Sequence, residues 1–434
     1  MFGYYFGLAV RSLQRNKALT GLMVLAIAMG IGASMTTLTV MHVLSGDPLP
    51  GHSGSLYYPQ VDPRDKDNYG PNVEPPDQLT WIDGMNLLRA KRATRQALMT
   101  EGMVPVQPAQ SGIAPFHATG LYTTADFFPM FDVPFQFGGG WSAAEDDGKA
   151  RVAIISAKLN DKLFGGQNSV GKELRLQKTT FRIVGVLGDW HPNPHFYQLY
   201  MGSYSDSEDV FVPLSTSRDL HIEHDGSTDC WGNSGGDEKN LEHMTCTWLQ
   251  FWVQLDSPAE VAAYRIFLEH YSQEQHAIGR FARPPNVRLR NVMQWLDYQQ
   301  VVPSDTRLQT WLALGFLVVC LVNTVGLMLA KFMRRAGELG VRRALGASQR
   351  TLFAQLLTES GVIGLAGASG GLLLAWLGLW LVRQQPADYA RLAHMDAAML
   401  LATFVLAVCA SLLAGLLPAW RACRVAPGLQ LKAN

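Results

Sequence analysis

Four long stretches without charged side chains divide this chain. Between Lys17 and Asp47 lie 29 residues that include no Asp, Glu, Lys or Arg. Three later stretches of 23, 23 and 24 residues also lack these four residue types. A helix needs roughly 20 apolar residues to cross a hydrocarbon core about 30 Å thick. The pattern therefore predicts four transmembrane helices, at residues 18–46, 308–330, 351–382 and 398–420.

The segment between the first two spans, residues 47–307, has a different pattern. Residues 47–78 are rich in Pro, Gly and Asp and are expected to be irregular, and 215–245 are expected to form a long polar loop. Apolar runs and alternation predict strands at 151–156, 172–177, 180–187, 248–255 and 287–289. Helical spacing predicts helices at 79–97, 157–164, 258–275 and 292–309, the last continuing directly into the second span. The fold class is thus four transmembrane helices with a large α+β domain inserted between the first and second.

Charge placement predicts the orientation of the chain, although its formal net charge is zero. Residues 47–307 hold 22 Lys/Arg and 32 Asp/Glu, a net −10, whereas basic residues gather at 1–17, 331–350 and 421–434. Cytoplasmic loops carry the excess of Lys and Arg. We therefore expect both termini and the 331–350 loop to be cytoplasmic, and the large domain and the short 383–397 loop to lie outside. Residues 1–17 mix aromatic and basic side chains at helical spacing, which favours an interfacial helix on membrane lipids over a simple extension of the first span.

Two of the five cysteines, Cys230 and Cys246, lie in the outer segment. In an oxidising compartment they are candidates for a disulfide, worth roughly 3 kcal/mol in the loop-closure model. Two buried free thiols are the alternative.

Three features of the sequence are candidates for a site of chemistry. Residues 166–173 nearly match a phosphate-binding loop, but Glu173 stands where the pattern needs a Ser or Thr for magnesium, so a turn between helix and strand is preferred. The pairs His191/His195 and His221/His224 have spacing that zinc sites use, yet scattered surface histidines explain them better, and we assign no metal site. No catalytic signature is found, so we expect no catalytic residue and no cofactor bound by this chain. A membrane-tethered enzyme using the His-rich stretch is the alternative of a different class.

Two features of the third span each allow two interpretations. Glu359 either lies at the cytoplasmic boundary or takes part in packing or coupling, because a carboxylate near a bilayer centre is costly. Small residues permit close contact between helices, so Gly361, Gly364, Gly367, Gly370 and Gly371 serve either dimerisation or packing within the chain.

The loop between the second and third spans carries the most specific motif, Arg334-Arg335-Ala336-Gly337-Glu338-Leu339-Gly340-Val341-Arg342-Arg343-Ala344-Leu345-Gly346-Ala347. Together with residues 356–359 and the C-terminal segment 415–422, this motif resembles the permease core of MacB/FtsX-type (type VII) ABC transporters. Short runs at 152–155, 163–165, 170–172 and 184–186 resemble the MacB-like periplasmic domain.

The resemblance implies a dimer of four-span subunits in the bacterial inner membrane, either two copies or this chain with a related permease. It also implies separate cytoplasmic ABC ATPase subunits that carry ATP and Mg, since no fused ATPase domain is found, and no nucleic-acid partner. ATP-driven closure would be transmitted to the periplasmic domains (mechanotransmission), exporting substrate from the periplasm with an adaptor and an outer-membrane channel. An FtsX-like regulator of cell-wall hydrolases and a lipoprotein-release permease are the alternatives.

Within this resemblance, Arg334, Arg335, Glu338, Arg342 and Arg343 are expected to form or flank the helix that contacts the ATPase. The alternative is that they are only positively charged anchors. Positive charge alone would account for the arginines, but not for Glu338 among three glycines.

Overall fold

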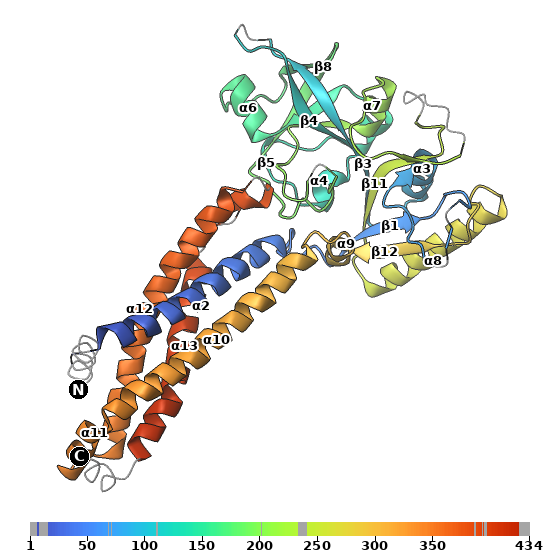
Figure 1. Ribbon diagram of the computed structural model, residues 1–434. Helices are drawn as coiled ribbons and strands as arrows, with labels where there is room; N and C mark the ends of the chain where they lie inside the picture. Colours follow the sequence, from blue (N-terminus) through green and yellow to red (C-terminus); the bar gives the residue numbers. More distant parts are fainter. Residues whose placement is uncertain are drawn as a thin grey trace. The chain divides into compact units, whose positions relative to one another are not determined.

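The computed structural model describes Gly7 and residues 16–424, apart from 68, 71, 110–111, 201, 233–240, 386–387, 393 and 395–396. The chain forms two compact units (Figure 1). The sheet unit is Gly46–Val301, and the helical unit consists of Met1–Ser45 and Val302–Asn434. The expected interfacial helix at 1–17 falls almost entirely outside the described residues.

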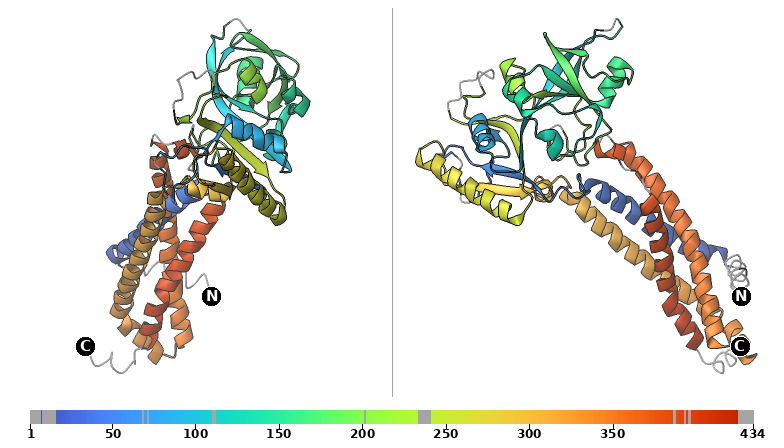
Figure 2. Two further views of the ribbon diagram at one scale, coloured as in Figure 1. Left: turned by 90° about the vertical axis from the view of Figure 1, so that its right-hand side faces the viewer. Right: turned by 180° about the vertical axis from the view of Figure 1, so that it is seen from behind.

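The helical unit is built from four long helices, each long and apolar enough to cross a membrane. Helices α2 and α13 each pack against both α10 and α12 (Figure 2). The prediction of four transmembrane helices is confirmed. The elements of this unit are α2 (Lys17–Leu44), α10 (Ser304–Arg334), α11 (Ala336–Ala344), α12 (Gln349–Arg383), the 3-10 helix η2 (Asp388–Leu392) and α13 (Ala397–Arg424).

Glycines on α12 allow its neighbours to approach closely. A methyl group added at Gly367 would lie 2.6 Å from Cγ2 of Ile27 on α2, and one at Gly371 would lie 2.8 Å from Cγ2 of Ile31. A methyl group at Gly364 would overlap Ser411 on α13. Of the two uses left open by the sequence, these glycines serve packing within the chain.

Twelve strands of the described residues form the sheet of the second unit, in the order β12-β1-β11-β3-β4-β9-β6-β8-β5. Strands β2 and β10 pair with β11, and β7 pairs with β3 and β8. The strands are β1 (Leu56–Val61), β2 (Leu79–Thr80), β3 (Arg95–Gln107), β4 (Phe116–Thr123), β5 (Phe135–Gly138), β6 (Val152–Ile155), β7 (Glu173–Leu176), β8 (Thr179–Leu187), β9 (Val210–Pro213), β10 (Asp229–Cys230), β11 (Cys246–Gln254) and β12 (Val287–Asn291).

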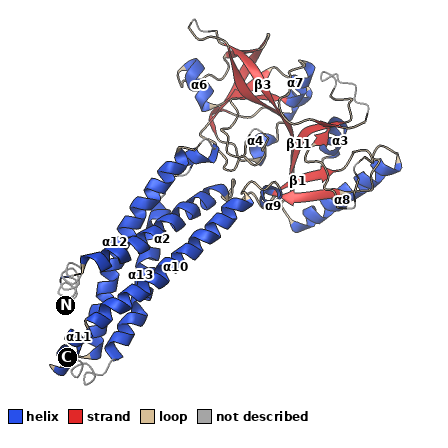
Figure 3. Ribbon diagram, in the orientation of Figure 1, coloured by secondary structure: helices blue, strands red, loops and turns tan. Residues whose placement is uncertain are grey.

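Strand β3 separates two hydrophobic cores, because successive side chains of a strand point to opposite faces. Leu98 and Val104 belong to one core, together with residues of α3, α6, α7 and α8, whereas Ala97 and Met99 belong to the other, with residues of α4 and α9. Figure 3 shows the helices and the strands of the sheet in separate colours. The helices of this unit are α3 (Trp81–Ala90), α4 (Phe127–Met130), α5 (Ala143–Asp147), α6 (Ala157–Phe164), α7 (Leu214–Asp219), α8 (Pro258–Ala277) and α9 (Val292–Tyr298).

The α+β fold class is confirmed, as are the predicted strands near 152, 173, 180, 248 and 287 and the helices near 157 and 258. The helix expected at 79–97 is wrong at both ends. It begins at Trp81, because the Thr80 side chain caps it by accepting from the Asp83 N–H, and it ends where Lys91 adopts a left-handed conformation (φ 49°). The chain then enters β3 instead of continuing the helix.

Three further expectations need correction. Residues 47–78, which were expected to be irregular, contain strand β1. This strand pairs with β11 and β12, although the residues around it are rich in proline. The 215–245 stretch is not all loop, since it holds most of α7 and all of β10. The helix expected at 292–309 is interrupted after Tyr298, where Gln300 has a positive φ (49°), and α10 begins only after Pro303.

Candidate functional site

The basic loop folds around the short amphipathic helix α11. Leu339 is buried in the core of the helical unit, while Val341 and Leu345 are 49% and 83% exposed. Val341 lies in the last turn of α11 and Leu345 is the C-cap residue four positions later, so these two side chains form an exposed apolar ridge at the C-terminal end of the helix. Glu338 and Arg342 on the same helix are also exposed. A helix that offers an apolar ridge flanked by charges has the character of a docking surface.

The two ends of the helix are fixed by local structure. Gly346 follows with φ +98°, a left-handed conformation that favours glycine, and its N–H donates to the Arg343 carbonyl. Ser348 then caps α12, its hydroxyl accepting from the Thr351 N–H at 3.2 Å. Only the four residues 345–348 lie between α11 and α12, so the two helices are joined by a tight connection.

Four ionisable side chains link α10, α11 and α12. Lys331 Nζ lies 2.6 Å from Glu359 Oε1, and both side chains are buried (0% and 1% exposed). Arg335, at the junction of α10 and α11, reaches Glu359 Oε2 at 3.2 Å and Glu338 Oε2 at 3.3 Å. We call Lys331, Arg335, Glu338 and Glu359 the charge network. Its two positive and two negative charges balance, as burial of charge requires.

Two of the remaining predicted residues contact α12 and α13. Arg342 donates to Gln355 Oε1 at 3.1 Å on α12, and Arg343 donates to the Cys423 carbonyl at 3.1 Å on α13. Arg334 is exposed at the end of α10. The structure thus brings Arg335 and Glu338 together and directs Arg342 and Arg343 to separate helices.

Sequence reasoning did not assign Lys331 or Gln355 to the site, and it left Glu359 undecided. The sequence did hold an indication of this pair, because Lys331 and Glu359 lie at the ends of apolar spans that hold few other charges. Their contact depends on how α10 packs against α12, which the spacing along the chain does not encode. The packing role for Glu359 is the one that the structure supports.

The other candidate features of the sequence are separate from this site. Cys230 and Cys246 form a disulfide and are direct partners in the β10–β11 pair. Residues 165–172 form a turn after α6 and before β7, the reverse of a phosphate loop, and Lys172 Nζ lies 5.0 Å from the centre of the Phe164 ring.

The histidines of the sheet unit do not gather. His191 is exposed and lies 3.1 Å from Asp189, whereas His195 is buried, and His224 packs on Trp248. Among the described residues, no group of three or more His, Cys, Asp and Glu side chains is placed to hold a metal ion.

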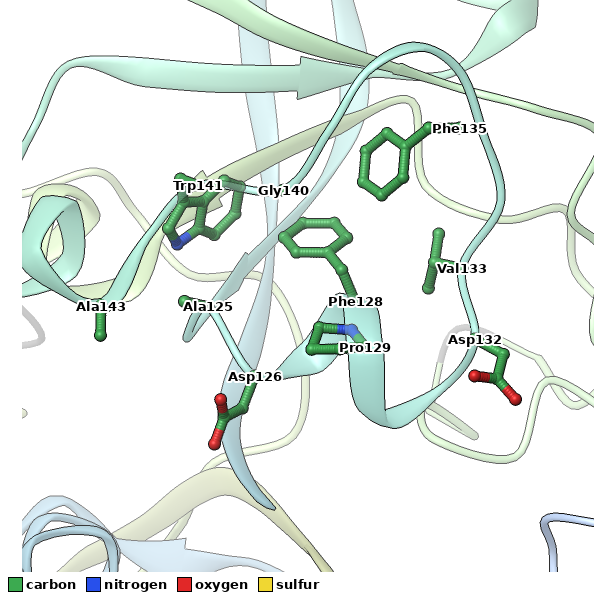
Figure 4. A pocket seen from close by; sticks show the side chains of 10 residues that line it. All are labelled: Ala125, Asp126, Phe128, Pro129, Asp132, Val133, Phe135, Gly140, Trp141 and Ala143. Atoms are coloured by element: carbon green, nitrogen blue, oxygen red, sulfur yellow. The ribbon is translucent and has the colours of Figure 1, made fainter. Parts of the chain in front are cut away.

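The sheet unit also has an open pocket of about 580 Å³ on the side of α4. Figure 4 shows Phe128 between Trp141 and Phe135 on its wall, with the carboxylates of Asp126 and Asp132 at its edge. Trp141 is held by a 2.7 Å hydrogen bond from its Nε1 to Asp146. Burial raises the pKa of Asp146 to about 6, despite the hydrogen bonds it accepts.

Two family models match the chain. The MacB-like periplasmic core domain matches residues 20–266, and the FtsX-like permease C-terminal matches residues 311–427. The first spans more than half of the chain.

Curated relatives agree with these matches. The pyoverdine export ATP-binding/permease protein PvdT of Pseudomonas entomophila is 26% identical over 69% of this chain and 41% of its own length. The macrolide export ATP-binding/permease protein MacB of Bdellovibrio bacteriovorus is 22% identical over 55% of this chain and 32% of its own. The chain spans less than half the length of these relatives. A solved periplasmic region of MacB from Actinobacillus actinomycetemcomitans aligns with 59% of this chain at 13% identity and a TM-score of 0.36.

Proposed function

Because this chain belongs to the MacB/FtsX family of ABC transporter permeases, we propose that it is the membrane subunit of an exporter whose ATPase is a separate chain. ATP and Mg would bind that ATPase, on the cytoplasmic side. The export functions in the names of the relatives support this assignment. The departure of residues 166–173 from a phosphate loop supports placing ATP hydrolysis elsewhere.

The observation that carries the proposal is the exposed ridge of Val341 and Leu345 on a helix joined to the charge network. An ATPase bound to this ridge would push or turn α11. Arg335 connects α11 to Glu359, and Glu359 in turn pairs with Lys331, so such a movement would reach α12 and α10 together. Helix α10 is covalently continuous with the sheet unit through residues 299–303, which gives the movement a path to the large domain.

The rest of the assembly follows from the same proposal. The excess of Lys and Arg around α11 and in the tail supports a cytoplasmic location for both termini and α11, with the sheet unit in the periplasm of an inner-membrane protein. A second permease subunit, a periplasmic adaptor and an outer-membrane channel would complete the exporter, which would move substrate outward from the periplasm.

The test is a mild-detergent pull-down of the tagged chain from its native membranes, followed by mass spectrometry. Wild-type chain should retain an ABC ATPase together with an adaptor. Leu345→Glu places a charge on the apolar ridge and should reduce ATPase capture by about tenfold or more. Val170→Glu adds the same charge to a 38% exposed position in the sheet unit and serves as the matched control.

A second variant separates docking from coupling. Glu338→Lys removes one of the two carboxylates that contact Arg335 and places a positive charge beside it, so membrane insertion should persist while transport is uncoupled from ATP hydrolysis. Normal transport by this variant would contradict a coupling role for Glu338. Absence of any ATPase from the wild-type complex would overturn the proposal itself, and a cell-wall hydrolase in place of the adaptor would favour the regulatory alternative.

A further inference from the structure

The sheet unit carries a basic region within a segment that is acidic overall. Residues 149–182 hold eight Lys or Arg and two Asp or Glu, a net +6, whereas residues 47–307 as a whole have a net −10. This region contains β6, α6, β7 and the start of β8, and these elements are neighbours: β6 and β7 pair with β8, and α6 packs against it. Clustered positive charge of this kind attracts negatively charged partners.

Four of the eight basic side chains have no carboxylate within ion-pair distance among the described residues. All four are exposed, and they are Lys162 of α6, Lys172 before β7, Arg175 of β7 and Lys178 after it. The other four basic residues of 149–182 each lie within 3.6 Å of a carboxylate. The positive charge around β7 is therefore not neutralised by the part of the chain that the structure describes.

Two of these cations are held over aromatic rings. Lys162 Nζ lies 3.2 Å from the centre of the Phe116 ring, and Lys172 Nζ lies 5.0 Å from the centre of the Phe164 ring. A cation over a ring is attracted to its face but keeps its charge. The two ammonium groups are thus placed in advance, and each can still attract an anion.

A pocket of about 340 Å³ lies between the end of α6 and β7. Phe164 and Pro108 are half-buried and offer apolar surface to it, and Leu163 and Leu174 are buried members of its lining. Arg175 also lines the pocket. The pocket therefore joins apolar surface to one of the four cations, with Lys172 beside it on the Phe164 ring.

Strand β3 leaves β7 beside this pocket, before β7 ends. The two strands pair only from Val106 with Leu176 to Gln107 with Arg175. Pro108 comes next, and a proline has no main-chain N–H with which to continue the pairing. The first part of β7 therefore has β8 on one side and, among the described residues, no strand on the other.

The main-chain groups of Glu173 face this open side. Alternate residues of a strand direct their N–H and C=O groups to the same neighbour. The Gln177 N–H donates to the Pro105 carbonyl of β3 at 2.8 Å, so Glu173, four residues earlier, faces the same way. Its partner on β8, Arg182, instead donates its N–H to the Arg151 carbonyl at 2.9 Å. The start of β7 is thus an open edge to which a further strand can add.

We propose that this edge binds an extended, acidic segment of another protein. The segment would pair with the main chain of Glu173, place an apolar side chain in the pocket against Phe164, and set carboxylates beside Lys172 and Arg175. Strand addition to an open sheet edge is a recurring mode of peptide recognition, in which main-chain bonds give affinity and side-chain pockets give specificity. Charge complementarity selects an acidic partner. This inference goes beyond the export function and does not depend on how α11 contacts an ATPase.

The test uses the full-length chain in phosphatidylcholine nanodiscs and a short, end-blocked fluorescent peptide of alternating glutamate and leucine. Fluorescence polarisation should show saturable binding, which weakens by about tenfold or more in about 0.5 M NaCl because salt screens exposed charges. Lys172→Glu with Arg175→Glu should weaken binding by a similar factor. Lys66→Glu with Arg265→Glu makes the same change of charge at two exposed positions away from β7 and should bind like the wild type. Thermal unfolding checks that both double variants are folded.

Modified peptides separate strand addition from simple attraction of charge. Methylation of alternate main-chain nitrogens leaves every carboxylate in place but removes N–H donors, and it should weaken binding by about tenfold or more. Serine in place of leucine should also weaken binding, and lysine in place of glutamate should abolish it.

Equal binding of the methylated peptide, no saturable binding, or undiminished binding by the β7 double variant would overturn the proposal. Salt-sensitive self-association of the wild type without peptide binding would also overturn it, and would assign the surface to a second copy of this chain. Should the β7 double variant fail to fold, the comparison of peptides on wild-type protein still decides.

Discussion

The helical unit and the sheet unit both bury ionisable side chains, but they surround them differently. In the helical unit Lys331 and Arg335 lie against Glu359 and Glu338, so each charge has an opposite neighbour within 3.3 Å. In the sheet unit Glu101, Glu208 and His195 share a cavity whose described lining has no Lys or Arg. The first set is complete in itself and is suited to holding helices together. The second set has an excess of carboxylates, and burial raises the pKa of Glu101 to about 9, so that this side chain holds a proton at neutral pH.

Breaking the balanced set should have the largest effect. Glu359→Ala leaves Lys331 buried without its counter-charge, and removal of one partner of a buried pair costs about 3–5 kcal/mol. We expect a correspondingly lower free energy of unfolding, measured by thermal unfolding in detergent. The double variant Lys331→Met with Glu359→Leu replaces both charges by apolar groups and should recover most of the loss. An unchanged unfolding transition in Glu359→Ala would mean that the pair contributes nothing to stability.

Removing the carboxylate from the unbalanced set should act in the opposite direction. The pKa of Glu101 is raised from 4.5 to about 9, so the folded chain binds more protons than the unfolded chain and loses stability as pH rises between these values. At about 1.4 kcal/mol per pH unit, the loss reaches about 3 kcal/mol at pH 7. Glu101→Gln does not titrate, and it should therefore unfold at a higher temperature than the wild type, by a margin that widens from pH 5 to pH 8. Parallel pH profiles for the two proteins would contradict the raised pKa.

A smaller loss of stability is expected when the close packing of the helices is disturbed and the charge network is left intact. Gly367→Ala forces a methyl group against Ile27 and should cost about 1–3 kcal/mol, the usual range for overpacking. Gly326 on α10 has no atom within 4 Å of an added methyl group, so Gly326→Ala should be neutral or slightly stabilising. Thermal unfolding of both variants in detergent measures the difference. Equal losses in the two would indicate that helix flexibility, and not contact between α12 and α2, decides the outcome.

The parts of this fold that the sequence predicts are those with a local cause. Apolar runs predict the four spans because a bilayer requires continuous hydrophobic length, and Ser156 and Gly165 bound a helix that was placed correctly. Strand β3 was not predicted, because Glu101, Gly102 and Pro105 interrupt its alternation of apolar and polar residues. Its position in the sheet also depends on pairing with β4, β7 and β11.

The charge network and the carboxylate-lined cavity also show that contacts between distant residues are not predicted from the sequence. Arg335 and Glu338 are three residues apart on the chain, so their contact follows from helical spacing. Glu359 is 24 residues from Arg335, so their contact depends on tertiary packing. His195 is 94 residues from Glu101, and only the fold brings both to the lining of one cavity. Glu101 had no sequence feature that distinguished it from a surface carboxylate.

Strands β1 and β12 bring the two ends of the large insert to one place. They pair in antiparallel register from Tyr57 with Asn291 to Val61 with Val287, so the chain enters the sheet next to where it leaves. A domain whose ends lie together can be removed or exchanged without separating the segments that flank it. Residues 46–301 therefore form an insert that can be exchanged between relatives without drawing apart the helices that flank it.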